Sequence, residues 1–331
     1  MDKKTLDRVI KRFTKDYNVP INIYDPDIFD YYTKLYDFFP KDIYKNLLET
    51  IEKDYNCDID AWINYCAGVR EKAINFIKEQ PEYQELLKDQ KYAINHIDLG
   101  VGERSCYTHE NNGKRFISID LKKANFQAMK AYGFIKEDTY EDFIKSFGGD
   151  DYIANSKYLR QVIFGNLNPL RQINKEKELI SNAYHLVEDM LTHDKSGADV
   201  ASIYSFNSDE IVLMVYPNYK DDEYIKETIK AAEEQIKNEL GTIVKIEYVE
   251  IEDLKILNYK DDPVEAYVRK NLVTGEEKLK KASTTFYPQI YKIWKGQKIT
   301  DADKLFYFEG QVCSFINELK QDTSIKFDDE G

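Results

Sequence analysis

Two acidic positions stand at the ends of short apolar runs, where a folded sheet would leave their carboxylates exposed. The run "FISIDL" has Asp120 near its end, and "SIYSFNSDEIVLM" has Asp209 and Glu210 between two apolar runs. Side chains of a strand alternate between its faces, so Asp209 and Glu210 are expected to point to opposite sides of a hairpin. If the two segments are neighbours in one sheet, Asp120 and Asp209 lie close together.

Such a pair of carboxylates predicts a metal site. Two neighbouring carboxylates repel each other unless a cation lies between them. Oxygen ligands with open positions suit Mg²⁺, which keeps water and accepts phosphate oxygens as further ligands. Two such ions, roughly 3.5 to 4 Å apart, hold the attacking and leaving oxygens of phosphoryl transfer in line. We expect Asp120 and Asp209 to bind two Mg²⁺ or Mn²⁺ ions, with Glu210 assisting catalysis or shaping the hairpin.

A third stretch, "SKYLRQVIFGNLNPLRQ", lies between the two acidic ones and has the spacing of a helix. Lys157, Arg160 and Phe164 fall at i, i+3 and i+7, which is roughly one helix face. Two cations and an aromatic ring on one face suit the phosphates and the base of a nucleoside triphosphate.

The order of the three stretches resembles motifs A, B and C of family A DNA polymerases and single-subunit phage-type RNA polymerases, over about residues 110–240. "SIDLKKANF" stands where the family has the Asp of motif A. "RQVIFGNLN" resembles its fingers helix, with Arg160 in place of a Lys and Phe164-Gly165 in place of its Phe-Gly. "NSDEIVLMV" resembles the family's His-Asp-Glu hairpin, with Ser208 where the His would be.

The chain also departs from the family's motifs. Ser156 stands where the fingers helix has its first Arg, and Asn168 stands where it has a Tyr. Many DNA polymerases have a Glu that takes part in sugar selection five residues after the motif A Asp. Here that residue is Asn125, which becomes a further nucleotide-binding candidate and leaves the choice between ribose and deoxyribose open.

The resemblance implies an enzyme, a small polymerase-like nucleotidyltransferase that extends a nucleic-acid 3′ end by two-metal phosphoryl transfer. Its partners would be nucleoside triphosphates and a DNA or RNA primer, with template use and oligomeric state left open. A 3′–5′ tRNA guanylyltransferase, a nucleotide cyclase and a catalytically inactive palm that binds nucleic acid are alternatives, as is an unrelated α+β scaffold. The cyclase-like "FGGDDY" at 147–152 fits a glycine helix end and a polar link better than a hairpin.

The pattern of elements predicts an α+β fold with an antiparallel sheet covered by helices. The resemblance implies that this sheet is a polymerase-type palm. Residues 1–90 are expected to be helical, and the resemblance implies that 91–260 form the palm with a fingers-like helical insertion at 139–192. Short β-type runs are expected over 91–121, with a hairpin turn at "NNGK". Helices are expected over about 139–147, 154–166, 170–192 and 221–239. Residues 261–331 are expected to form a hairpin and two helices that act as a thumb or a packing region, the last helix beginning near Asp301.

The C-terminal "KLKKASTTFYPQIYKIWKGQK" interleaves lysines with aromatic residues, a composition that suits contacts with phosphates and bases. The expected nucleic-acid contacts are Lys280, Lys281, Tyr291, Lys292 and Trp294. The alternative is an amphipathic helix that buries Tyr291 and Trp294 and leaves its lysines outside.

The composition limits the class of protein. A net charge of −13 over 331 residues argues against nonspecific binding of nucleic acid across the whole surface. No apolar run reaches the length of a membrane span, and the N-terminus does not resemble a signal peptide. Four scattered cysteines favour reduced thiols and a cytoplasmic location. The abundance of Lys, Asn, Ile and Tyr suits an AT-rich bacterial or phage genome.

Overall fold

The computed structural model describes residues 1–88 and 99–322. These residues form two compact units. Unit 1 comprises Met1–Asn64, Glu252–Arg269 and the described residues from 278 onward, and unit 2 comprises the described residues of Tyr65–Ile251 with Lys270–Glu277. The expected boundaries near 90 and 260 therefore differ from the observed ones, since the N-terminal and C-terminal segments belong to the same unit.

Unit 2 contains most of the sheet on which the acidic residues lie. The strands β2 (Ala201–Phe206), β3 (Glu210–Val215), β1 (Arg115–Leu121) and β4 (Val244–Asp253) follow one another in that spatial order. The sheet continues to β7 (Tyr267–Asn271) and β8 (Glu277–Lys280), and the end of β4 and most residues of β7 and β8 belong to unit 1. β1 pairs antiparallel with both neighbours, so Ile119 lies opposite Ile211 on β3 and Ile246 on β4. The two apolar stretches that carry the acidic residues are thus adjacent strands.

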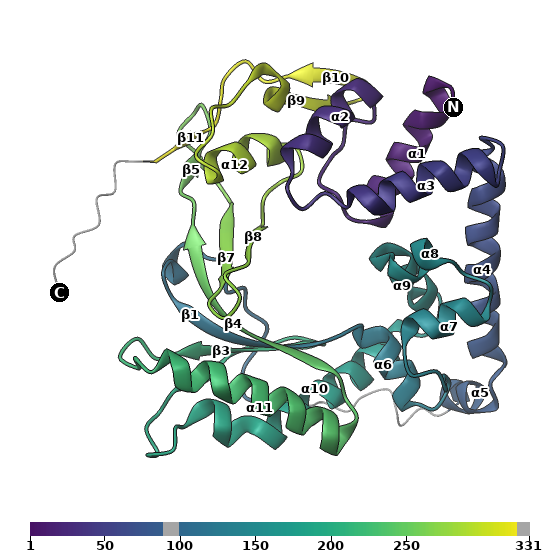
Figure 1. Ribbon diagram of the computed structural model, residues 1–331. Helices are drawn as coiled ribbons and strands as arrows, with labels where there is room; N and C mark the ends of the chain where they lie inside the picture. The colour runs from purple at the N-terminus through teal and green to yellow at the C-terminus, as the bar shows by residue number, and fades with distance from the viewer. Residues whose placement is uncertain (89–98, 323–331) are drawn as a thin grey trace. The chain divides into compact units, whose positions relative to one another are not determined.

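Two long helices, α10 (Pro169–Thr192) and α11 (Asp222–Leu240), cover one face of this sheet (Figure 1). Ile117, Ile119 and Leu121 of β1 point into the core that these helices close. Because side chains alternate along a strand, Ser118 and Asp120 lie on the other face. The antiparallel α+β arrangement is as expected.

Unit 2 also contains shorter helices, one before β1 in the sequence and four after it. They are α5 (Pro81–Lys88), α6 (Ala124–Ala131), α7 (Tyr140–Ser146), α8 (Asp151–Asn155) and α9 (Lys157–Gly165). The helix expected over 154–166 is divided at Ser156, whose hydroxyl caps α9 by accepting a hydrogen bond from Leu159 N–H at 3.1 Å. The "FGGDDY" segment is a helix end and link, as expected, with Gly148 at φ +81°.

Unit 1 combines the N-terminal helices with C-terminal strands. It contains α1 (Lys3–Asp16), α2 (Pro26–Leu35), α3 (Lys41–Lys53), the start of α4 (Ile59–Glu79) and α12 (Tyr287–Trp294). Its short strands are β5 (Ile256–Leu257), β6 (Pro263–Val264), β9 (Leu305–Phe308), β10 (Gln311–Ser314) and β11 (Lys320–Gln321).

Two expected elements are wrong. The last expected helix is a 3₁₀ turn, η3 (Asp301–Lys304), followed by the β9–β10 hairpin, because aromatic and β-branched residues flank a turn with Gly310 at φ +87°. Thr300, and not Asp301, caps the turn. The hairpin turn expected at "NNGK", residues 111–114, is wrong, because Asn111 ends a 3₁₀ turn, η2 (His109–Asn111), and no strand precedes it within residues 99–114. The β-type runs expected over 91–98 lie outside the described residues.

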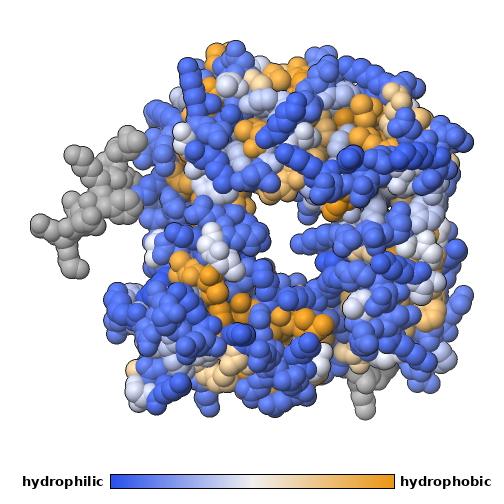
Figure 2. Space-filling model, viewed as in Figure 1, coloured by the Kyte–Doolittle hydropathy of each residue, from blue (hydrophilic) through white to orange (hydrophobic). Residues whose placement is uncertain are grey.

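Hydrophilic residues cover most of the surface in view (Figure 2). In the described ranges, no helix combines the length and the apolar character that a bilayer crossing requires.

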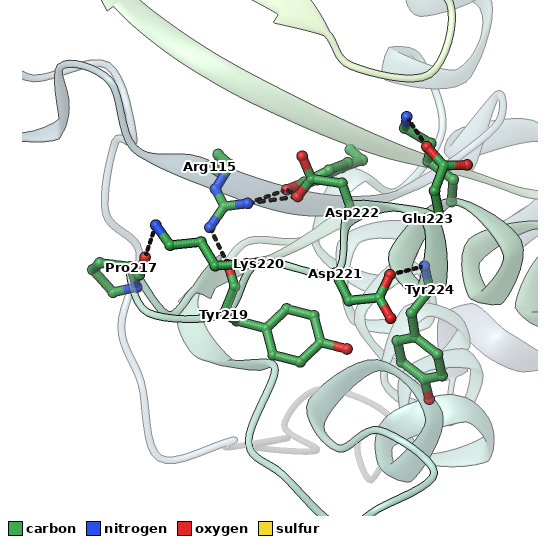
Figure 3. A network of polar contacts seen from close by, with 10 residues as sticks. Arg115, Pro217, Tyr219, Lys220, Asp221, Asp222, Glu223 and Tyr224 are labelled. Atoms are coloured by element: carbon green, nitrogen blue, oxygen red, sulfur yellow. Dashed lines mark hydrogen bonds and ion pairs between the residues drawn. The ribbon is translucent and has the colours of Figure 1, made fainter.

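A half-buried arginine, Arg115, links the start of α11 to the sheet (Figure 3). Arg115 of β1 donates to Asp222 Oδ1 at 2.6 Å, to Tyr248 Oη at 2.9 Å and to the carbonyl oxygen of Tyr219 at 2.6 Å. Tyr248 Oη in turn donates to Asp222 at 2.7 Å. These bonds hold the β3–α11 connection against the first residue of β1.

Replacing this arginine tests how strongly the network holds unit 2 together. Arg115→Met should lower the free energy of unfolding by about 1 to 3 kcal/mol, because three acceptors, among them the buried Tyr248, lose a charged donor. Lys130→Met is the matched control, since its partner Asp138 is 95% exposed and such pairs contribute about 1 kcal/mol or less. Urea unfolding followed by circular dichroism measures both, and equal losses would contradict the prediction.

Candidate functional site

A cavity of about 380 Å³ opens in unit 2 beside the end of β1. Residues from β1, α6, α9, α10 and the β2–β3 turn line it. Its charged lining residues are three acids and three cations: Asp120, Glu176, Asp209, Lys123, Lys157 and Arg160. Amide side chains of Asn125, Gln161 and Gln172 also line it. One cavity therefore contains residues singled out in all three of the stretches analysed above.

The pairing of β1 with β3 places Asp120 and Asp209 on one side of the cavity. Asp120 stands opposite Glu210 in the register, and the N–H of Leu121 donates to the carbonyl oxygen of Asp209 at 2.9 Å. The turn before β3 is therefore fixed against the end of β1. Asp120 and Asp209 are both half-buried, and both line the cavity.

Glu210 has different surroundings from Asp209. Its carboxylate accepts a hydrogen bond from Ser118 Oγ at 2.5 Å, on the sheet face away from α10 and α11, and it does not line the cavity. This placement favours the expectation that Glu210 shapes the hairpin over the expectation that it assists catalysis.

The basic side comes from α9. Lys157 is exposed at its first turn, and Arg160 is half-buried one turn later, with Cζ 5.7 Å from the ring centre of Tyr140. Burial lowers the pKa of Arg160, against the raising effect of the nearby Tyr140 and Glu141. A guanidinium nevertheless stays protonated in proteins. Its Nε is buried without a hydrogen-bond partner in the described part of the chain, so a phosphate oxygen is a suitable acceptor.

Phe164 does not have its expected role. Its side chain is 0% exposed and packs against Tyr140, with ring centres 6.0 Å apart, so it is not available to a base or a sugar. The next residue, Gly165, lines the cavity instead. Asn125 lines the cavity as expected of a nucleotide contact, and its side-chain oxygen accepts from Phe126 N–H at 3.0 Å.

Glu176 and Gln172 of α10 are cavity residues that the sequence analysis missed. Glu176 is 6% exposed, and Gln172 Nε2 donates to its Oε1 at 2.8 Å. Burial, together with the negative charge of Asp209, raises the pKa of Glu176 to about 7, although the bond from Gln172 opposes the shift. The sequence contains a signal for Glu176, because its spacing from Ile180 and Tyr184 places it on the same buried stripe of the helix.

The C-terminal residues expected to contact nucleic acid lie in unit 1, and none of them lines the cavity. Tyr291 is 2% exposed and packs on Tyr36, and its hydroxyl accepts from Asp37 N–H at 3.3 Å. The expected contact of Tyr291 with nucleic acid is therefore wrong, and the amphipathic alternative accounts for it. Lys280, Lys292 and Trp294 are half-buried, and Lys281 is exposed. The ammonium of Lys295 lies 3.7 Å from the ring centre of Trp294.

The donor set of the cavity fits a hard divalent cation. Within residues 1–88 and 99–322, no three or more His, Cys, Asp or Glu side chains are grouped closely enough to hold a metal by themselves. Mg²⁺, however, commonly uses one or two carboxylates and takes its other ligands from phosphate and water. Asp120 and Asp209 supply two carboxylates of this kind, and a cation there would relieve the repulsion between Asp209 and Glu176.

Comparisons with protein-family models, with curated proteins and with solved structures found no match for this chain. A function must therefore be inferred from the chemistry of the cavity and from the motifs.

The raised pKa of Glu176 predicts a pH-dependent stability. Its folded value of about 7 lies above its ordinary value of 4.5, so its contribution is fully present below pH 4.5 and is lost as the pH rises through 7. The unfolding free energy of wild type relative to Glu176→Gln should fall by about 3 kcal/mol across this window.

Urea unfolding at several pH values measures this difference. Glu234→Gln, at an exposed position of α11, removes one charge from the same unit and serves as the control. If the difference in unfolding free energy from wild type changes equally with pH for both variants, the assignment of the pH dependence to Glu176 is contradicted.

Proposed function

We propose that unit 2 is a polymerase-like nucleotidyltransferase that uses nucleoside triphosphates to extend a nucleic-acid 3′ end. The observation that carries the proposal is the cavity in which Asp120 and Asp209 face the same space as Lys157 and Arg160. Transfer of a nucleotidyl group needs this combination, because the reacting phosphates are anionic and their charge must be held and neutralised.

Lys157 and Arg160 would bind the phosphates of the incoming nucleotide. The planar guanidinium of Arg160 can donate to two phosphate oxygens at once, whereas the ammonium of Lys157 acts as a flexible point charge. The volume of about 380 Å³ falls within the range of small-molecule sites and suits one nucleotide. Asn125 and Gln161 would supply polar contacts to its sugar or base.

Asp120 and Asp209 would hold two Mg²⁺ or Mn²⁺ ions, which when bound neutralise phosphate charge and make the attacking hydroxyl more acidic. The primer 3′ hydroxyl attacks the α-phosphorus and loses its proton to water. A new P–O bond forms, the bond to the β-phosphate's bridging oxygen breaks, and pyrophosphate leaves. Lys157 and Arg160 stabilise the charge that develops on the departing phosphates.

A second candidate is an inactive palm that binds nucleic acid. The observation in its favour is that, among the described residues, no group of three or more potential ligands is set up for a metal. An enzyme of this design depends on substrate oxygens to complete its coordination, whereas a binding module needs no metal. Metal dependence separates the two.

The first test is incorporation of labelled ribo- and deoxyribonucleotides onto a short primer, with and without template, in Mg²⁺ or Mn²⁺. Asp120→Ala and Asp209→Ala should each reduce incorporation below detection, because each removes a carboxylate of the proposed metal site. Asp151→Asn is the control and should keep full activity, because Asp151 is exposed and lies outside the cavity.

Absence of metal-dependent incorporation by wild type, with primer binding retained, would support the binding module. Analysis of the product, extended at the 3′ or the 5′ end or cyclised, separates the polymerase from the guanylyltransferase and cyclase alternatives.

Removing one phosphate-binding cation should weaken nucleotide use selectively. Lys157→Gln and Arg160→Met should each raise the KM for the nucleoside triphosphate about 10-fold or more, because a hydrogen bond to a charged group contributes about 1.5 to 3 kcal/mol. Steady-state extension measures KM, and Lys136→Gln, at an exposed position outside the cavity, is the charge-matched control. An unchanged KM in both cavity variants would count against the assigned roles.

A further inference from the structure

We infer that Lys123 is a third phosphate-binding cation of the cavity and that the ring of Tyr140 positions Lys123 and Arg160 for one polyphosphate chain. This deepens the proposed function, on which it rests, by naming the triphosphate as the part of the ligand that the site recognises most strongly. The inference comes from four contacts around a single ring.

The backbone at Lys123 is unusual for a lysine. It has φ +53° and stands at the N-cap of α6, where its side chain makes no capping bond. The left-handed region favours Gly, Asn and Asp, and Ser, Thr, Asp and Asn are the residues that cap helices well. A lysine here serves neither purpose. Its side chain instead lines the cavity three residues after Asp120.

The ammonium of Lys123 is held in place from outside the cavity. It forms an ion pair with Glu141 of α7, and its Nζ lies 5.9 Å from the ring centre of Tyr140. Glu141 does not line the cavity. An ammonium has three N–H donors, so one can remain with Glu141 while the others bind phosphate. The ion pair therefore fixes the cation without using all of its donors.

Tyr140 contacts two cavity cations at once. The Cζ of Arg160 is 5.7 Å from the same ring centre to which Lys123 is 5.9 Å. Both fall within the range of cation–π attraction, which grows where the cation is desolvated. The ring is fully buried against Phe126 and Phe164, so its position is fixed by the core.

The hydroxyl of Tyr140 does not hold the two cations. Its Oη is buried and has no hydrogen-bond partner in the described ranges, and burial raises the pKa of Tyr140, so the phenol stays neutral. A neutral ring attracts cations by its π face. Tyr140 is thus a positioning residue that holds Lys123 and Arg160 on the same side of the cavity.

Three cations suit a chain of phosphates better than a single phosphate. Lys123 comes from the β1–α6 link, whereas Lys157 and Arg160 come from α9, so the three cations approach the cavity from two elements. Arg160 also has a buried Nε that lacks an acceptor among the described residues. A ligand with several phosphates offers more negative charge and more acceptor oxygens to the three cations than a single phosphate does. Affinity should therefore rise steeply with the number of phosphates.

The test uses inorganic tripolyphosphate, pyrophosphate and orthophosphate as probes, in titration calorimetry with the full chain at low ionic strength and without divalent ions. Lys123→Gln should weaken tripolyphosphate binding about 10-fold and orthophosphate binding by less than about 3-fold, because a charged contact contributes about 1.5 to 3 kcal/mol. Lys122→Gln is the matched control, since Lys122 is the exposed neighbour outside the cavity and should bind as wild type does.

Variants of Tyr140 separate the ring from general packing. Tyr140→Phe keeps the ring and should retain the ratio of tripolyphosphate to orthophosphate affinity. Tyr140→Leu should lower this ratio about 3- to 5-fold, because it removes two cation–π contacts. A purely structural role would lower both affinities together and leave the ratio unchanged. If Tyr140→Leu does not fold, loss of the ratio of tripolyphosphate to orthophosphate affinity in Tyr140→Phe would still overturn the role of the ring, because that variant keeps the ring and lacks only the hydroxyl.

The inference and the proposed function can fail separately. Equal tripolyphosphate affinity in wild type and Lys123→Gln overturns the inference, whether or not the primer is extended. Tripolyphosphate binding that depends on Lys123, in the absence of primer extension that depends on Asp120, would support the phosphate site and overturn the proposed enzymatic activity. An equal loss for all three probes in Lys123→Gln would assign the residue to folding and would also overturn the inference.

Discussion

The site depends first on the antiparallel register of β1 and β3. Asp120 stands opposite Glu210, and the bond from Leu121 N–H to the Asp209 carbonyl, 2.9 Å long, fixes the turn beside the end of β1. A slip of one residue would turn Asp120 into the apolar face that α10 and α11 cover and would expose Ile119 or Leu121. The burial of three apolar side chains of β1 thus keeps one carboxylate in the cavity. Stability and the proposed chemistry share this constraint.

The second requirement is that acidic and basic side chains stay apart within one cavity. Contacts with residues outside the cavity or on its wall hold these side chains in position. Glu141 pairs with Lys123 from α7, the Tyr140 ring lies near Arg160, and Gln172 bonds to Glu176. Each of these contacts comes from an element that also packs in the core, so the cavity side chains are held in place before a ligand binds. Such preorganisation is what electrostatic catalysis needs, because the polar groups need not reorient when the ligand's charge changes.

The sequence predicts the sheet, the two covering helices and several site residues, because strand alternation and helix spacing report which side chains share a face. Asp120, Asp209, Lys157 and Arg160 line one cavity for this reason. Asn125, which was predicted from the family resemblance, lines it too. Spacing does not report what a face packs against. Phe164 shares the face of Lys157 by spacing, yet it is buried against Tyr140. Glu176 was missed although its spacing places it on the stripe of Ile180 and Tyr184, because the spacing does not show that this end of the stripe faces a cavity. Lys123 was missed because a left-handed lysine leaves no pattern in the sequence. The β9–β10 hairpin was taken for a helix because its ten residues, 305–314, mix apolar and polar positions in an order that fits the period of a helix as well as that of a strand.

The charge of the chain limits how the proposed enzyme would hold its substrates. At −13 it repels a long polyanion at a distance, and the burial of Tyr291 removes one of the aromatic contacts expected for a primer. In the proposed enzyme, phosphate recognition would therefore be local, through the three cavity cations that approach from two elements. Such a site would select the short, highly charged triphosphate over the nucleic-acid backbone, because the triphosphate would bring its charge into a volume of about 380 Å³. Binding of the nucleotide would then contribute more to assembling the reactive complex than binding of the primer.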